Sequence, residues 1–341
     1  MTGRADRAVE FLTRAGWGSA ARAALAGDAS FRRYERLTDQ GTGGGERRAI
    51  LMDAPPPQED VRPFLTVARL LRQMGFSAPR ILAEDATAGF LLLEDFGDRT
   101  YTRLLGEGAD ETGLYSLAVD VLIALHRGFD AMRYGGVPAY DDAKLLGEAA
   151  LLVDWYLPAL TGQSTPPELR DDYLATWRTL LPLAQSMPAT LVLRDYHVDN
   201  LMLLDGRAGL AACGLLDFQD AVIGSPAYDL VSLVEDARRD ISPTLAAAMI
   251  ERYLLAFPEF DRADFHAVSS LLAVQRNCKI IGIFTRLWRR DGKPGYLVHI
   301  PRVWRLVERD IAHPALAPIK HWLDRHIPPG RRRMPAFQDG T

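Results

Sequence analysis

The chain has 341 residues, 48 % of them hydrophobic and 25 % charged, the composition of an ordinary globular protein rather than a disordered one. Its 40 basic and 44 acidic residues give a net charge of −4, which offers no overall attraction for nucleic acid. Two cysteines make no disulfide framework, the N-terminus lacks a secretory signal, and no apolar run approaches the ~20 residues of a membrane helix. We expect a cytoplasmic protein without a membrane or nucleic-acid partner and with no protein partner evident.

The first 95 residues contain helical and strand-like segments, and the strand-like ones predominate. Apolar positions at helical spacing predict helices over residues 4–15 and 61–74. Strands are predicted at 26–37, 47–54, 80–85 and 89–95. We therefore expect a small β-rich lobe over residues 1–95.

Helical periodicity dominates the rest of the chain. The predicted helices are 112–127, 166–186, 226–238, 243–257, 262–290, 296–311 and 315–326. Three short apolar runs, at 190–194, 201–204 and 213–216, are predicted as strands. We expect an α+β protein in which residues 96–330 form a larger helical lobe and residues 331–341 a flexible tail.

Three polar residues follow those short apolar runs. Asp195 comes after the first run, Asn200 lies five residues later, and Asp217 ends the third run. Phosphoryl transfer mainly requires positioning and charge neutralisation, with a carboxylate for the acceptor hydroxyl and hard oxygen ligands for Mg²⁺. An isolated Asx residue in a turn is more often structural, but all three at this spacing favour catalysis. We interpret Asp195 as the base and Asn200 and Asp217 as metal ligands.

An upstream loop of small residues suits contact with phosphates. It contains Gly27, Asp28, Ala29 and Ser30, and its glycine and alanine allow backbone N–H groups to approach an anion. A plain hairpin turn is the alternative explanation. The position of the loop, ahead of a strand pair and of the predicted catalytic residues, favours phosphate binding.

The segment that joins the two predicted lobes is a second candidate for nucleotide contact. The backbone of Glu94–Gly97 offers hydrogen bonds to an adenine edge, so Glu94 and Phe96 are candidate ATP contacts, together with Phe31 beside the phosphate loop. A simple interlobe linker is the alternative, and the two roles are compatible.

Two motifs resemble a known family. R-D-Y-H-V-D-N (194–200) and L-L-D-F-Q-D (215–220) resemble the catalytic and metal loops of the aminoglycoside phosphotransferase family, relatives of the protein kinases. The resemblance implies a protein-kinase-like, two-lobed fold with an ATP cleft between the lobes. It also implies that ATP and Mg²⁺ are used, and that Asp229 in the following helix braces the catalytic loop.

Further segments resemble a narrower group, the anomeric kinases of cell-wall amino sugars. They are G-D-A-S-F-R-R-Y (27–34), M-D-A-P-P-P (52–57), L-L-L-E-D-F-G-D (91–98) and Q-R-N-C-K-I-I-G-I-F-T-R-L (275–287). This resemblance implies an ATP-dependent kinase that phosphorylates the C1 hydroxyl of N-acetylmuramic acid and/or N-acetylglucosamine in peptidoglycan recycling.

One family residue is missing, the strand lysine that holds the α- and β-phosphates. Met52 stands about where it would lie, and residues 1–143 contain no lysine. We hypothesise that an arginine replaces it, either Arg32 or Arg33, with Arg47 and Arg48 as further candidates.

The acceptor site is the least specified part of the sequence. His197 and Asp220 lie next to the catalytic motifs, and Trp155 offers an aromatic wall, although a structural histidine and a core tryptophan are the alternatives. Arg276 and Lys279 interrupt an apolar helix and suit the lactyl carboxylate of muramic acid, or else an internal ion pair.

Two other functions are consistent with these motifs. One is a kinase for another small alcohol, of the aminoglycoside, choline or homoserine type, although the basic residues of 276–290 argue against a polycationic acceptor. The other is a pseudokinase that serves as a binding module, which the missing lysine favours and the intact Asp195, Asn200 and Asp217 oppose.

Overall fold

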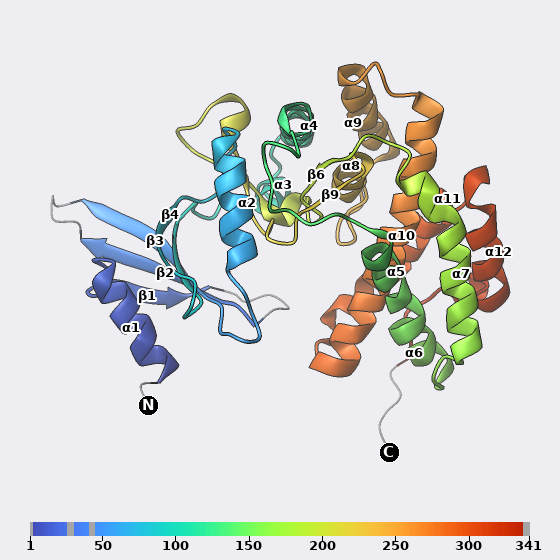
Figure 1. Ribbon diagram of the computed structural model, residues 1–341, viewed down its shortest axis with the longest axis horizontal. Coiled ribbons are helices and arrows are strands. Elements are labelled where there is room, and N and C mark those ends of the chain that lie inside the picture. Colours follow the sequence, from blue (N-terminus) through green and yellow to red (C-terminus); the bar gives the residue numbers. More distant parts are fainter. Residues whose placement is uncertain (1–2, 26–30, 41–44, 337–341) are drawn as a thin grey trace. The chain divides into compact units, whose positions relative to one another are not determined.

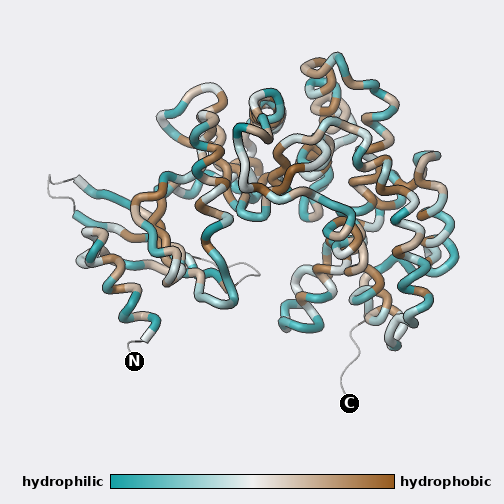
Figure 2. Tube along the Cα trace, viewed as in Figure 1, coloured by the Kyte–Doolittle hydropathy of each residue, from teal (hydrophilic) through white to brown (hydrophobic). Residues whose placement is uncertain are grey.

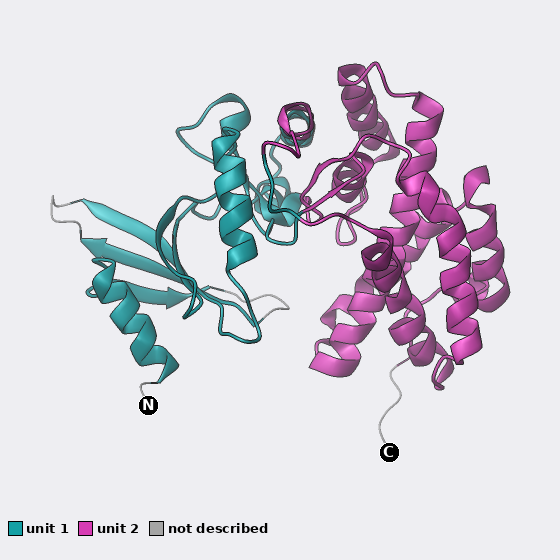
Figure 3. Cartoon of the chain, in the orientation of Figure 1, with its two compact units in different colours: residues 1–121, 134–137, 198–221 teal, residues 122–133, 138–197, 222–341 magenta. Residues whose placement is uncertain are grey.

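The computed structural model describes residues 3–25, 31–40 and 45–336, so the predicted phosphate loop, Gly27–Ser30, lies outside it. The chain forms two compact units, shown in Figure 3. One contains residues 1–121, 134–137 and 198–221, and the other contains 122–133, 138–197 and 222–341. The lobes at 1–95 and 96–330 stay predictions, because after residue 121 the chain passes back and forth between the two units.

The first unit is built on an antiparallel sheet of five strands in the order β1-β2-β3-β5-β4 (Figure 1). The strands are β1 (Ala21–Ala24), β2 (Arg33–Gln40), β3 (Glu46–Asp53), β4 (Ile81–Asp85) and β5 (Phe90–Glu94). Its other elements are α1 (Arg4–Arg14), α2 (Arg62–Gln73), α3 (Tyr101–Gly106), most of α4 (Glu111–Gly128), β7 (Leu201–Leu203) and β8 (Cys213–Leu215).

The two faces of this sheet have different tasks, because successive side chains of a strand point to opposite faces. Leu37, Leu51 and Leu92 belong to a buried cluster with Phe11 and Leu12 of α1. The alternate residues of β2, β3 and β5 face away from that cluster and line a pocket. Hydropathy also varies along the strands: β5 is apolar, whereas β2 ends and β3 begins with polar residues, on either side of their connecting loop (Figure 2).

The second unit is mainly helical. Its helices are α5 (Asp142–Leu151), α6 (Leu157–Thr161), α7 (Pro167–Ala184), α8 (Ala227–Val234), α9 (Pro243–Ala256), α10 (Arg262–Asp291), α11 (Ile300–Asp310) and α12 (Ala317–His326). A short antiparallel pair, β6 (Thr190–Val192) with β9 (Val222–Gly224), carries the chain into and out of the region of Asp195. The long, largely buried α10 packs against α5, α7, α8 and α11.

The predicted helices and strands exist, with shifted ends and some omissions. The predicted helix 226–238 ends at Val234, because Asp236 accepts a hydrogen bond from the backbone N–H of Arg238 at 2.7 Å and forms an Asx turn instead. The predicted helix 296–311 starts at Ile300, with Pro301 in its first turn. Five elements had no prediction, namely β1, α3, α5, α6 and β9.

The start of the segment predicted as a flexible tail is anchored in the second unit. The Arg332 side chain is 4 % exposed and pairs with Asp324 at 2.6 Å. The Tyr156 hydroxyl donates to the backbone carbonyl of Arg333 at 2.8 Å. Residues 337–341 lie outside the described part of the chain.

The helices in the described ranges include none with both the length and the hydropathy that a bilayer crossing needs.

Gly282 is a sensitive point of the helical packing. A Cβ atom at Gly282 would lie 2.4 Å from the carbonyl group of Leu151, at the end of α5. We predict that Gly282→Ala destabilises the protein by about 1–3 kcal/mol, because neither backbone can move away cheaply. The exposed helical Gly147, whose added Cβ would meet no described atom within 4 Å, is the control. Gly147→Ala should raise stability by about 0.5–1 kcal/mol in urea denaturation, and equal effects of the two substitutions would contradict the packing argument.

Candidate active site

The first unit contains a pocket of about 530 Å³. It opens on the face of the sheet opposite the α1 cluster. Its lining residues are Leu25, Arg32, Tyr34, Arg36, Ile50, Met52, Phe64, Pro79, Leu93, Glu94, Asp95, Phe96, Gly97, Asn200, Met202, Leu216, Asp217, Gln219 and Asp220. The predicted metal ligands, several predicted nucleotide contacts and the position of the missing lysine therefore all line one pocket.

Asn200 and Asp217 lie side by side in this pocket. The Asn200 side-chain amide is 3.5 Å from a carboxylate oxygen of Asp217, and the other Asp217 oxygen accepts from Gln219 at 2.8 Å. Asp217 has a positive φ of 56°, which is uncommon for a residue other than glycine and typical of functional turns. No group of three or more His, Cys, Asp or Glu side chains suited to a metal occurs in the described ranges. One carboxylate and one amide oxygen nevertheless fit Mg²⁺, which usually takes few protein ligands and completes its shell with phosphates and water.

Arg32 is the arginine of this pocket that lies beside Asp217. Its guanidinium donates to Glu59 at 3.0 Å and lies 3.8 Å from an Asp217 oxygen. The other Glu59 oxygen accepts from the backbone N–H of Phe31 at 3.1 Å, which fixes the start of β2. On the neighbouring strand, Met52 is the register partner of Tyr34. The guanidinium of Arg32, the residue before β2, thus lines the same pocket as Met52, which stands about where the family's lysine would be.

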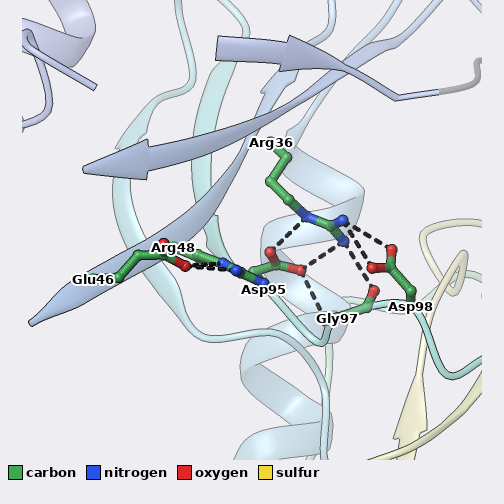
Figure 4. A network of polar contacts seen from close by, with 6 residues as sticks. All are labelled: Arg36, Glu46, Arg48, Asp95, Gly97 and Asp98. Carbon is green, nitrogen blue, oxygen red and sulfur yellow. Dashed lines mark hydrogen bonds and ion pairs between the residues drawn. The ribbon is translucent and has the colours of Figure 1, made fainter. Parts of the chain in front are cut away.

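Arg36 binds the segment between Glu94 and Asp98 to β2 (Figure 4). Its guanidinium forms an ion pair with Asp95 at 2.7 Å and another with Asp98 at 2.8 Å, and it donates to the Gly97 carbonyl at 3.0 Å. Asp95 in turn accepts from the Gly97 N–H at 2.8 Å. One planar cation therefore fixes the backbone that was predicted to meet an adenine edge.

Glu94 and Phe96 are held by Arg207. The Arg207 guanidinium donates to Glu94 at 2.5 Å and to the Ser77 hydroxyl at 2.8 Å, and lies 5.3 Å from the centre of the Phe96 ring. The second Glu94 oxygen accepts from the Arg80 N–H at 3.1 Å. The Glu94 side chain thus bonds to the protein itself, and residues 94–97 all belong to the lining of the pocket.

Other predicted phosphate ligands lie elsewhere in the first unit. Arg33 is exposed on the opposite face of β2 and does not line the pocket. Arg47 pairs with Asp39 and lies over Trp17, and Arg48 pairs with Glu46. Phe31 is 66 % exposed.

The second unit carries the predicted base in a tightly held turn. Arg194 has a positive φ of 70°, and the Asp195 N–H donates to the Leu193 carbonyl at 2.9 Å. Asp229, fully buried in α8, accepts from the backbone N–H groups of Leu193 and Arg194 at 2.6 and 2.8 Å. Burial raises the pKa of Asp229 to about 7, although both N–H groups oppose the shift. These are the contacts that a bracing role for Asp229 requires.

The predicted acceptor residues are divided between the two units. Asp220 lines the pocket with Asn200 and Asp217, whereas His197, Arg276 and Trp155 belong to the second unit. His197 is buried, and that burial lowers its pKa. Arg276 is also buried and donates to the backbone carbonyl of Glu235 at 3.2 Å. Trp155 is half-buried in a π-helical turn, Leu152–Tyr156.

Lys279 takes the internal alternative. Its ammonium group lies 3.2 Å from Glu148, so this lysine forms an ion pair inside the second unit.

Several residues of the site had no prediction, chiefly Glu59, Arg36 and Arg207. The period-two pattern of β2 contained a signal for one of them, because Arg32, Tyr34 and Arg36 must share a face. Glu59 and Arg207 contact the site from loops distant in sequence, and no local pattern marks such contacts.

A small antiparallel sheet with a pocket lined by an amide and a carboxylate, followed by a larger helical part, is the architecture of protein-kinase-like phosphotransferases. The model of the phosphotransferase enzyme family matches residues 22–266, and the chain belongs to this family. It is an enzyme that transfers a phosphoryl group to an alcohol.

Relatives and solved structures agree with this assignment. The chain is 39 % identical to an N-acetylmuramate/N-acetylglucosamine kinase of Caulobacter vibrioides, over 95 % of this chain and 96 % of the relative. It is 42 % identical to the kinase of that name in Pseudomonas aeruginosa, over 90 % of both chains. The fold is similar to that of a GDP complex of aminoglycoside 2'-phosphotransferase-IIIa, with a TM-score of 0.61 and 16 % identity over 91 % of this chain and 99 % of the other. A choline kinase of Streptococcus pneumoniae gives a TM-score of 0.58 at 10 % identity, over 91 % and 100 % of the chains.

We predict that Arg36→Met weakens nucleotide binding by about tenfold, the equivalent of about 1.4 kcal/mol. The substitution leaves the buried Asp95 carboxylate without its cation and releases the backbone of residues 95–98. Arg48→Met is the matched control, since Arg48 is a half-exposed arginine of β3 that pairs with Glu46 (Figure 4). Calorimetric titration with ATP measures the affinity of both variants, and equal affinities would contradict the role of Arg36.

Proposed function

We propose that the protein is an ATP- and Mg²⁺-dependent sugar kinase that phosphorylates the C1 hydroxyl of N-acetylmuramic acid and/or N-acetylglucosamine in peptidoglycan recycling. Four relatives at 35–42 % identity, matched over 83–95 % of the chain, carry that pair of sugars in their names, and this observation supports the proposal most strongly. The pocket of the first unit supports the nucleotide part, with Asn200 and Asp217 as oxygen ligands beside Arg32.

In this proposal Asp195 accepts a hydrogen bond from the sugar hydroxyl and takes its proton as the new O–P bond forms and the bond to the leaving ADP breaks. Asn200 and Asp217 hold Mg²⁺, which neutralises phosphate charge when bound. The strained turn at Arg194, held by Asp229, keeps the Asp195 backbone fixed so that its carboxylate needs little reordering.

Arg32 takes the role of the missing lysine. Burial lowers the pKa of Arg32, but Tyr34 and Glu59 raise it above its usual value, so the guanidinium stays charged. Glu59 orients this cation from the side, and a guanidinium can contact two phosphate oxygens at once. Arg33 points to the other face of the sheet.

We predict that Arg32→Ala weakens ATP binding about ten- to a hundredfold, because a charge-assisted contact to phosphate is lost. Arg33→Ala, one residue away on the opposite face, should leave the affinity within about twofold. Titration of both variants with ATP and Mg²⁺ provides the comparison. Unchanged ATP affinity in Arg32→Ala would refute the proposed contact between Arg32 and the phosphates.

The acceptor side is proposed from the second unit. His197 belongs to the catalytic loop, Arg276 of α10 donates to the Glu235 carbonyl at the end of α8, and Arg276 suits the lactyl carboxylate of N-acetylmuramic acid. Trp155 is proposed as an aromatic wall, and Asp220 as a polar contact from the first unit.

If Arg276 contacts the lactyl carboxylate, Arg276→Met should impair phosphorylation of N-acetylmuramic acid more than that of N-acetylglucosamine.

The decisive test is a phosphotransfer assay over N-acetylmuramic acid, N-acetylglucosamine, other hexoses, an aminoglycoside, choline and homoserine. We predict turnover of the two amino sugars with formation of an acid-labile sugar 1-phosphate, and a loss of about 10²–10⁴ in kcat for Asp195→Asn. Turnover of another alcohol alone would establish the alternative kinase, and nucleotide binding without turnover would establish a binding module. Full activity of Asp195→Asn would overturn the catalytic assignment.

A further inference from the structure

A buried cluster of charges lies next to the predicted base in the second unit. It consists of Glu148 on α5, Lys279 on α10 and Arg194, whose side chains are 12 %, 11 % and 13 % exposed. α5 and α10 pack side by side (Figure 1), which brings Glu148 and Lys279 together.

Glu148 is shared by four donors. One of its oxygens accepts from the Arg194 guanidinium and lies 3.2 Å from the Lys279 ammonium group. The other oxygen accepts from the Tyr140 hydroxyl and lies 3.4 Å from the Gln275 amide. The amide of Gln275 is itself fixed by the Leu145 carbonyl at 3.0 Å. A carboxylate held from so many sides is a rigid anchor for the arginine that precedes Asp195.

Both cations of the cluster contact the same carboxylate. Burial and the neighbouring Arg194 lower the pKa of Lys279, but Tyr228, Glu148 and Asp195 raise it above its usual value. Lys279 therefore stays charged, and its ion pair with Glu148 holds in place the carboxylate that the Arg194 guanidinium also contacts.

The backbone makes this coupling rigid. Arg194 is held in the left-handed conformation while both Asp229 oxygens accept backbone N–H groups of the turn and the Ser232 hydroxyl donates to the Arg194 carbonyl at 3.3 Å. Such a conformation costs about 1–3 kcal/mol and persists only where surrounding contacts determine it. Asp229 thus fixes the backbone of Arg194, and Glu148 fixes the side chain of the same residue.

We propose that Lys279 and Glu148 are positioning residues for the base, which hold the Arg194 side chain and with it the turn that carries Asp195. This inference rests on the proposed role of Asp195. Lys279 keeps Glu148 in place beside Arg194, and so keeps Asp195 oriented for the acceptor hydroxyl without contacting either substrate itself. Loss of its charge should therefore affect the chemical step rather than the binding of either substrate.

The experiment compares Lys279→Met with Lys279→Arg in steady-state assays with ATP and an amino-sugar acceptor. We expect Lys279→Met to lower kcat about ten- to a hundredfold, the usual effect of losing an outer partner of a reacting group, with both KM values within about twofold. Lys279→Arg, which keeps the charge, should recover most of kcat. Lys320→Met is the control, because Lys320 is half-exposed and pairs with Asp324 across one helical turn.

A kcat of Lys279→Met within twofold of the unchanged protein, or equal losses in Lys279→Met and Lys279→Arg, would overturn the proposal. Thermal unfolding and ATP titration show whether the variants are folded. If Lys279→Met does not fold, Lys279→Gln, which is neutral but can still donate to Glu148, must show the same loss in kcat.

A double-variant comparison separates this inference from the proposed function. If Lys279 acts through Asp195, Lys279→Met should change the residual activity of Asp195→Asn by less than about twofold. Full activity in Asp195→Asn alone would refute the assigned base. An inactive Asp195→Asn beside a normal Lys279→Met would refute only the role of Lys279.

Discussion

The two backbone hydrogen bonds that Asp229 accepts are the constraint on which the catalytic turn depends. A buried carboxylate without donors would be unfavourable, and a positive φ at Arg194 would be unfavourable without an external hold. Each feature stabilises the other, since the turn supplies two N–H groups and the carboxylate fixes them at 2.6 and 2.8 Å. The short pair of β6 and β9 and the helix α8 are the framework that brings these groups together.

The first unit solves a different problem, the supply of fixed positive charge in a pocket beneath a small sheet. Two arginines provide it, Arg32 just before β2 toward Asp217, and Arg36 on β2 toward the segment of Asp95 and Asp98. A guanidinium can contact several oxygens in one plane, whereas an ammonium group acts as a point charge. This property lets Arg36 hold two carboxylates and a carbonyl oxygen at once. It also suits the role that we propose for Arg32 in place of the family's lysine.

Much of this fold could be predicted from the sequence, because strong periodicity marks the long helices and the strands β2, β3 and β5. Apart from α5, which has ten residues, the elements without a prediction have three to six residues each. β1 consists of four exposed residues, and α6 follows a π-helical turn that breaks helical spacing. Their positions depend on tertiary contacts that a single sequence does not display.

The candidate site could be predicted where it is local in sequence and not where it is assembled from distant segments. Asp195, Asn200 and Asp217 occur at recognisable spacing, and Asp229 follows in the same motif region. Sequence reasoning left Arg32 and Arg33 as alternatives, and the pleat of β2 distinguishes them. The partners Glu59, Arg207 and Glu148 lie 27, 113 and 46 residues from the groups they hold, so only the folded chain relates them.

The choice of arginine has a consequence for chemical labelling. All four lysines, Lys144, Lys279, Lys293 and Lys320, belong to the second unit, so no lysine amine occurs in the unit that contains the pocket. Acyl-phosphate analogues of ATP mark kinases by acylating a lysine beside the phosphates, and a guanidinium, which keeps its proton, is a poor nucleophile. On the proposed nucleotide role of this pocket, such analogues would find no lysine amine in the unit that lines it.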